Sequence, residues 1–243
     1  MQIQALNNIE PDQTTVGELV AQNYHAAGIF RKYGVDFCCG GGVTVRKACE
    51  TKGIEESELI DELCGIQKST PTDAENFYAW QPDVLIEHIM DTHHNYVRSK
   101  TEEIGYYAAK VARVHGQNHP ENREIWSLFV ELTNELLTHL KEEEETVFPA
   151  IQALYKGRLE RKSTEQEEAI INESLGEMES DHEHAGSIMA SIREKSNQYT
   201  PPEDACTTYR ILYQNLKDFE EDLHKHVHLE NNILFEQAKS LLA

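Results

Sequence analysis

Apolar side chains recur at spacings of three and four residues in almost every segment of this chain longer than ten residues. That spacing puts them on one face of an α-helix, whereas the alternation typical of a half-buried β-strand is hard to find. We therefore predict an all-α fold. Four segments are long, at about 82–114, 121–154, 165–195 and 206–241. The breaks between them are short enough to make consecutive helices antiparallel, which predicts a four-helix bundle over residues 82–243.

A small helical domain is predicted ahead of the bundle, over residues 1–66. Thr15 and Glu18 form a capping box for a helix that extends to Tyr33. Two short helices are expected to follow, at about 45–52 and 56–63. A linker that contains Ser, Thr and Pro and lacks apolar periodicity is expected at 67–81.

Charge and cysteine content limit the function. The chain contains 22 Lys and Arg residues and 43 Asp and Glu residues, which gives a net charge of -21. This charge repels nucleic acid and anionic membranes. No apolar run approaches the roughly 18 residues that span a bilayer, and the start of the chain lacks the features of an export signal. We expect a cytoplasmic protein. Its five cysteines, two of them adjacent (Cys38 and Cys39), are expected to be reduced.

Histidine and glutamate interrupt the apolar stripes of the bundle helices. The second stripe contains His139 and Glu143, the fourth His226 and Glu230, and the third His182. A buried charge or imidazole without a partner costs several kcal/mol, so each pair requires either mutual hydrogen bonds in the core or a cation. For each pair of consecutive helices, the residue halfway along the sequence between their histidine positions falls in or near the predicted turn. Antiparallel packing therefore brings the histidines to one height in the bundle.

The first bundle helix offers adjacent histidines. Its stripe of Ile86, Met90 and Val97 favours His93 by phase, while His94 lies at the edge of the stripe. The remaining histidines show no matching depth or face and are expected at the surface or around the ligands: His25, His88, His115, His119, His184, His224 and His228. Within the run 142–145, every glutamate except Glu143 is expected on a solvated face.

Four imidazoles and two carboxylates from four helices favour a dinuclear site, with each carboxylate bridging two metals and each metal taking two imidazoles. Nitrogen and oxygen ligands together suit Fe or Mn, with Zn as an alternative and Mg disfavoured. We favour two iron ions, since two ferrous ions and two glutamates leave a charge that an acidic bundle accommodates.

Several motifs resemble those of the hemerythrin-like di-iron proteins that repair iron-sulfur clusters, the repair-of-iron-centres family. They occupy residues 30–33, 36–41, 139–149, 179–183, 205–208 and 226–232. The resemblance implies an oxo- or hydroxo-bridged di-iron centre and favours His94 over His93 in the first helix. The ligands that it implies are His94, His139, Glu143, His182, His226 and Glu230. One departure is Phe235-Glu236, where Phe-Pro is expected.

The same resemblance implies repair of iron-sulfur clusters damaged by nitrosative or oxidative stress, by donation of iron to the damaged proteins. A nitric oxide or peroxide reductase, or a carrier or sensor of oxygen or nitric oxide, is the alternative. For Cys38 and Cys39 it implies a thiol role in repair: contact with a damaged cluster, iron passage or nitric oxide capture. The chain is expected to act as a monomer or a homodimer.

Overall fold

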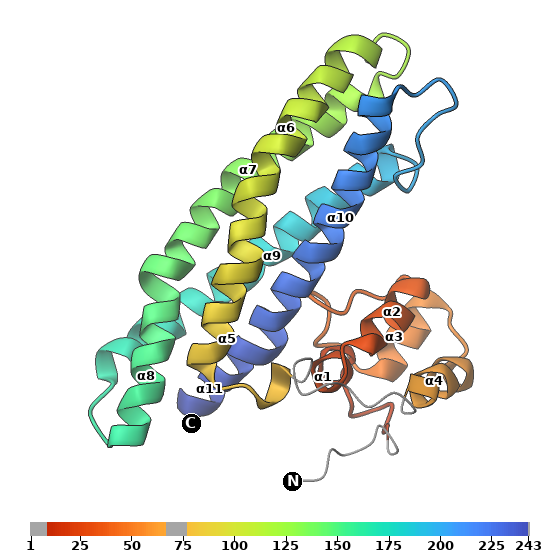
Figure 1. Cartoon of the computed structure of the whole chain (residues 1–243). Coiled ribbons are helices and arrows are strands. Elements are labelled where there is room, and N and C mark those ends of the chain that lie inside the picture. The colour runs from red at the N-terminus through yellow and green to blue at the C-terminus, as the bar shows by residue number, and fades with distance from the viewer. Residues whose placement is uncertain (1–8, 67–76, 243) are drawn as a thin grey trace. The chain divides into compact units, whose positions relative to one another are not determined.

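The computed structural model describes residues 9–66 and 77–242, and over these ranges the chain is helical. The described residues contain no β-strand, only an isolated bridge between Thr15 and Thr44, so the all-α prediction is confirmed (Figure 1). Most of the predicted linker 67–81, and the first eight residues, lie outside the described ranges. Among the described helices, none combines the length and the apolar character needed to cross a membrane.

The chain divides into two compact units, residues 1–85 with 227–243 and residues 86–226. The helical segments of the first unit are α1 (Val16–Gln22), α2 (His25–Lys32), α3 (Val45–Lys52), α4 (Glu56–Gly65), η3 (Phe77–Ala79), η6 (Glu230–Leu234) and α11 (Phe235–Leu242). The capping box is present, because Thr15 Oγ1 accepts from the Glu18 amide at 3.2 Å and Glu18 Oε2 accepts from the Thr15 amide at 2.8 Å. The single helix predicted through residue 33 is wrong, since two helices meet at Asn23.

Asn23 explains this break. Its backbone is extended (φ -153°), and its side-chain Oδ1 accepts a hydrogen bond from the His25 amide at 3.0 Å. Asparagine offers the backbone this local alternative to a helical hydrogen bond. The apolar spacing continues across the break, so the pattern alone predicts one helix.

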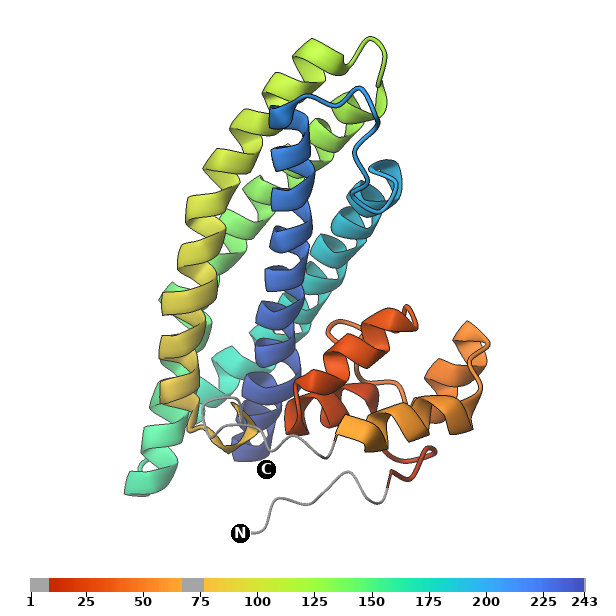
Figure 2. The ribbon, with the colours of Figure 1, turned by 45° about the vertical axis from the view of Figure 1, so that its right-hand side comes forward.

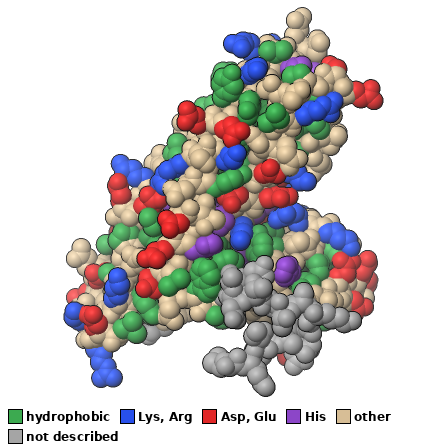
Figure 3. Space-filling model, viewed as in Figure 1, with side chains coloured by type: hydrophobic (Ala, Val, Ile, Leu, Met, Phe, Trp, Pro, Cys, Tyr) green, Lys and Arg blue, Asp and Glu red, His purple; other side chains and the backbone are tan. Residues whose placement is uncertain are grey.

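The second unit contains four long helical segments that run side by side (Figure 2). In chain order they are α5 (Pro82–His88) with η4 (Ile89–His94) and α6 (Asn95–His115); α7 (Glu121–Glu142) with η5 (Glu143–Val147) and α8 (Phe148–Glu160); α9 (Glu165–Lys195); and α10 (Thr207–Leu229), which continues into η6. α6 packs on α7 and α7 on α9, as the predicted antiparallel bundle requires. Charged side chains of both signs are spread over the face seen in Figure 3.

The second long segment extends to Glu160, beyond the end predicted at about residue 154. The helix ends where Arg161 adopts a left-handed conformation (φ 56°). Gly157 lies inside this helix, where a Cβ would lie only 2.2 Å from Thr164 Cγ2. The returning chain can approach the helix this closely because glycine has no side chain.

Within residues 9–66 and 77–242, three short π-helical segments interrupt the α-helices, at η4, η5 and η6. Each adds one residue to a turn and therefore shifts the phase of the helix face. His94 is the last residue of η4, and Glu143 and Glu230 are the first residues of η5 and η6. The interruptions thus coincide with the polar positions of the stripes.

Candidate metal centre

Two groups of buried side chains present potential metal ligands. One consists of His94, Glu143 and His226, with Glu230 one helical turn beyond His226; the other consists of His139, Glu143 and His182. Within each group the ligand atoms lie within 4.8 Å of one another. All six predicted ligands fall in these groups, and His93 does not.

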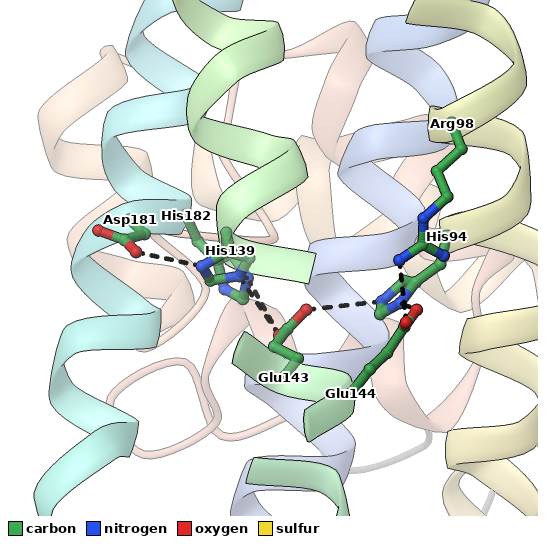
Figure 4. A network of polar contacts seen from close by, with 7 residues as sticks. All are labelled: His94, Arg98, His139, Glu143, Glu144, Asp181 and His182. Carbon is green, nitrogen blue, oxygen red and sulfur yellow. Dashed lines mark hydrogen bonds and ion pairs between the residues drawn. The ribbon is translucent and has the colours of Figure 1, made fainter. Parts of the chain in front are cut away.

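Glu143 belongs to both groups and lies at their centre (Figure 4). Its side chain is fully buried, and neither carboxylate oxygen has a hydrogen-bond partner. Oε1 faces Nε2 of His139 at 3.3 Å and of His182 at 3.9 Å, while Oε2 faces Nε2 of His94 at 3.5 Å. The two oxygens therefore face different sets of imidazoles.

These separations fit a shared cation better than hydrogen bonds. Two ligands about 2.1 Å from one ion and about 90–110° apart lie roughly 3.0–3.4 Å from each other. His139 Nε2 and Glu143 Oε1, 3.3 Å apart, lie inside this range, whereas His139 Nε2 and His182 Nε2 are at a hydrogen-bond distance of 2.9 Å. A buried carboxylate without hydrogen bonds is unfavourable, and a cation between it and the imidazoles removes that penalty. The donor set therefore fits a metal.

Carboxylates outside the groups orient two of the imidazoles. His94 Nδ1 lies 2.7 Å from Glu144 Oε1, and His139 Nδ1 lies 3.1 Å from Asp181 Oδ2. Because an ionised carboxylate only accepts, each Nδ1 carries the proton and each Nε2 directs its lone pair toward Glu143. Carboxylate–histidine pairs of this kind are typical of metal sites, where they fix the ring and raise its basicity.

Glu144 is a residue whose role the sequence pattern missed. It was expected on a solvated face, but its side chain is half-buried and binds both His94 and Arg98, the latter at 2.9 Å. Burial raises the pKa of Glu144, yet the hydrogen bonds from Arg98 and His94 outweigh burial and leave the pKa lowered. Its position next to Glu143 in the sequence is the one signal that could have identified it.

The adjacent histidines of the first helix have different partners. His93 is also buried, but its Nδ1 binds Asp222 Oδ1 at 2.9 Å and its ring stacks on His226, with centroids 5.6 Å apart. Burial lowers the pKa of His93. A single face cannot hold two consecutive residues of a regular α-helix, and the π turn of η4 explains how both become buried.

Not all the other histidines lie at the surface. His228 is 1% exposed and packs within the first unit against the rings of Tyr24 and Phe37, where burial lowers its pKa to about 3. His115 lies 3.2 Å from the thiol of Cys206 and is the last residue of α6, whereas His94 directly precedes the first.

The adjacent cysteines lie in the loop between α2 and α3. Cys38 is buried and Cys39 half-buried, with their sulfurs 3.9 Å apart. Asp36 Oδ1 accepts from the Cys38 amide at 2.9 Å and from its thiol at 3.2 Å. The hydrogen bond with Cys39, burial, and the charge of Asp36 together raise the pKa of the Cys38 thiol well above its usual value.

Comparison with known proteins gives two family matches. The Hemerythrin HHE cation binding domain matches residues 85–238, and ScdA_N, described as a Domain of Unknown function (DUF542), matches residues 12–67. The chain is 34% identical over 224 residues to the iron-sulfur cluster repair protein ScdA of Staphylococcus haemolyticus, covering 92% of this chain and 97% of that protein. It is 32% identical over 229 residues to the iron-sulfur cluster repair protein YtfE of Cronobacter sakazakii, covering 92% and 95%. The identity to YtfE of an Enterobacter species is 31% over the same shares.

Proposed function

Because this chain belongs to the family of iron-sulfur cluster repair proteins with a hemerythrin HHE cation binding domain, we propose that it binds two iron ions in its bundle and delivers iron to damaged iron-sulfur clusters. The observation that supports this most is the Glu143 carboxylate, buried without hydrogen bonds and facing imidazoles from both groups. A carboxylate in this position can hold two cations at once.

The proposed ligands divide between the two ions. His94 and His226 would hold one ion and His139 and His182 the other, with the Glu143 and Glu230 carboxylates available to both. Iron suits this set because imidazole and carboxylate together match its ligand preference. When bound, iron supplies ligand exchange and one-electron redox chemistry. Glu144 and Asp181 hold the imidazoles in position, so that the site keeps its shape as iron is taken up and released.

The proposal extends to the thiols of Cys38 and Cys39. Cys39, half-buried in its loop, can contact a damaged client protein, and the buried Cys38 lies directly beside it. The clients are damaged iron-sulfur proteins of the cytoplasm, and the proposed trigger is nitrosative or oxidative stress.

Iron transfer to a defined client tests this function. Iron-loaded protein is mixed with a dehydratase whose cluster has been destroyed by nitric oxide, and recovered dehydratase activity is measured against an equal amount of free ferrous iron. We expect recovery beyond the free-iron control, and recovery at the control level contradicts the proposal. Glu143→Gln should abolish the gain. Glu135→Gln is the matched control, because Glu135 also faces a histidine, His184 at 3.3 Å, but both side chains are exposed.

Reduction of nitric oxide is a second candidate function. With two imidazoles and at most two carboxylates, each proposed ion keeps open positions for a small ligand. Each nitrous oxide formed consumes two nitric oxide molecules, two protons and two electrons, so headspace analysis with an excess of a chemical electron donor decides between the functions. Multiple turnovers per chain indicate a reductase, whereas stoichiometric or absent product leaves iron donation as the function.

A further inference from the structure

Outside the bundle, one loop brings two thiols and a carboxylate together. The ligand atoms of Asp36, Cys38 and Cys39 lie within 4.8 Å of one another, in the connection between α2 and α3. All three residues belong to the first unit and none contributes to the two histidine groups.

The separations between these atoms match those of ligands on a single ion. Sulfurs about 2.3 Å from a tetrahedral ion lie about 3.8 Å apart, and a sulfur and a carboxylate oxygen about 3.5 Å apart. The observed distances are 3.9 Å between the two sulfurs and 3.2 Å between Cys38 Sγ and Asp36 Oδ1. An ion can therefore enter with only small side-chain movements.

The loop is held in this conformation from outside. Asn232 Nδ2 donates to the carbonyl oxygens of Phe37 and Cys38, at 3.2 Å each. At Gly41, a Cβ would lie 2.5 Å from the Phe37 carbonyl oxygen and 2.9 Å from Asn232 Oδ1, so the backbone approaches closely here. These contacts fix the backbone that carries the thiols, which lowers the entropic cost of gathering the ligands.

We propose that Asp36, Cys38 and Cys39 form a second cation site, for a borderline divalent ion such as ferrous iron or zinc. Thiolate ligands select such ions over magnesium or calcium. On binding, each thiol releases its proton to solvent, and the two sulfur–metal bonds and one oxygen–metal bond leave a net charge of −1 on the unit. The fourth tetrahedral position stays open to water or an incoming ligand, as in sites that exchange ligands rather than structural sites.

The site is accessible from one side. Asp36 is exposed and Cys39 half-buried, while Cys38 is buried beneath them. An ion therefore enters from the Asp36 side. This inference rests on the role proposed above for the two thiols and gives it a chemical basis, but it does not depend on iron in the bundle.

Cobalt absorption tests the site in the full-length chain, kept anaerobic with a phosphine reductant. Thiolate bound to Co²⁺ gives a near-ultraviolet charge-transfer band, and the bundle groups, which offer only nitrogen and oxygen, give none. We expect the band in the parent and in Glu143→Gln, and its loss in Cys39→Ser. Cys64→Ser is the matched control, because Cys64 is another half-buried thiol of the first unit. Asp36→Asn should keep the band but weaken Co²⁺ binding about tenfold or more.

A second measurement needs no variant. Zn²⁺ should protect both Cys38 and Cys39 of the parent from alkylation, as read by peptide mass spectrometry, while Cys64 stays as reactive as before. Absence of the cobalt band from the parent, its persistence in Cys39→Ser, or alkylation unaffected by Zn²⁺ overturns the proposal. Failure of Glu143→Gln to lose iron would instead count against the bundle centre alone.

Discussion

The two ends of the second unit contain the same kinds of side chain in different environments. At one end, here called the ligand end, His94, His139 and His182 surround the buried carboxylate of Glu143. At the far end, His119 binds Asp204 at 3.0 Å, and the Asp204 carboxylate is exposed.

Hydrogen bonding separates the two ends more clearly than residue type. At the far end His119 has an ionised partner and the buried Tyr209 hydroxyl accepts from Asn122 at 2.7 Å, although the neutral Asn122 Oδ1 has no hydrogen-bond partner. At the ligand end, Glu143 makes no hydrogen bond. Histidine beside a carboxylate is thus ordinary at a surface, and it indicates a metal only where burial leaves the acceptor unsatisfied.

The largest expected effect is at Glu143. Glu143→Leu should lose most of both iron ions, because a bridging carboxylate serves both, whereas His182→Leu should lose mainly one. The metal-free Glu143→Leu chain should be more stable than the metal-free parent by about 1–4 kcal/mol, since a buried charge without hydrogen bonds is replaced by an apolar side chain. Iron analysis and urea unfolding measure the two effects.

Glu121→Leu gives the control at the far end, where Glu121 Oε1 faces His119 at 3.4 Å. Its iron content should equal that of the parent. Two irons retained in Glu143→Leu would show that this carboxylate does not bridge, and the contrast between the two ends would then lose its main support.

Much of this difference can be predicted from the sequence. The stripes that contain His139, His182 and His226 are buried as their spacing predicts, because residues three and four apart share a helix face whatever the neighbouring helices do. The distance of His115 from His94 along one helix also predicts that His115 lies far from the centre.

The π turns and the orienting carboxylates could not be predicted in this way. A π turn depends on how several helices pack, and a regular period of 3.6 residues has no place for the extra residue. For the same reason the phase of Ile86 and Val97 favours His93, although His94 joins the group with Glu143. The contact between Glu144 and His94 joins residues on different helices, which single-helix periodicity does not address.

The next effect in size separates the adjacent histidines. His94→Ala should lose one iron and shift the visible absorption of the centre. His93→Ala should keep both irons but lower the free energy of unfolding by about 1–3 kcal/mol, because it leaves a cavity and removes the partner of Asp222. His115→Ala, at the far end, should change neither iron content nor absorption. Iron lost from His93→Ala and kept in His94→Ala would reverse the assignment.

A smaller effect is expected at Glu144, which touches the centre only through His94. Glu144→Gln should keep the full iron content at saturation but weaken iron binding about 10–100-fold, because the ring loses its charged hydrogen-bond partner. Competition with a chelator of known affinity measures this change. Glu145→Gln is the control, since Glu145 is exposed and pairs only loosely with Lys141, at 3.9 Å. Equal affinities in the two variants would show that Glu144 does not support the ligand.

The smallest effect is a pH dependence at the far end. The hydrogen bond with Asp204 raises the pKa of His119, and the same contact lowers the pKa of Asp204. The histidine therefore contributes stability that is complete below its unfolded pKa of about 6.5 and is lost as the pH rises through its higher folded pKa. The carboxylate contributes stability above its unfolded pKa of about 3.9, and this stability is lost as the pH falls through its lower folded pKa.

Between these limits, at pH 5, Asp204→Asn should lower the melting temperature by about 1–2 °C, a small change because an exposed pair is screened by solvent. At pH 9, where His119 is neutral, the variant should lower the melting temperature by almost nothing. Comparing variant and parent at each pH cancels the contribution of the ligand end. A larger decrease at pH 9 than at pH 5 would mean that a charged His119 does not stabilise this pair, and the far end could then no longer serve as the ion-paired counterpart of the ligand end.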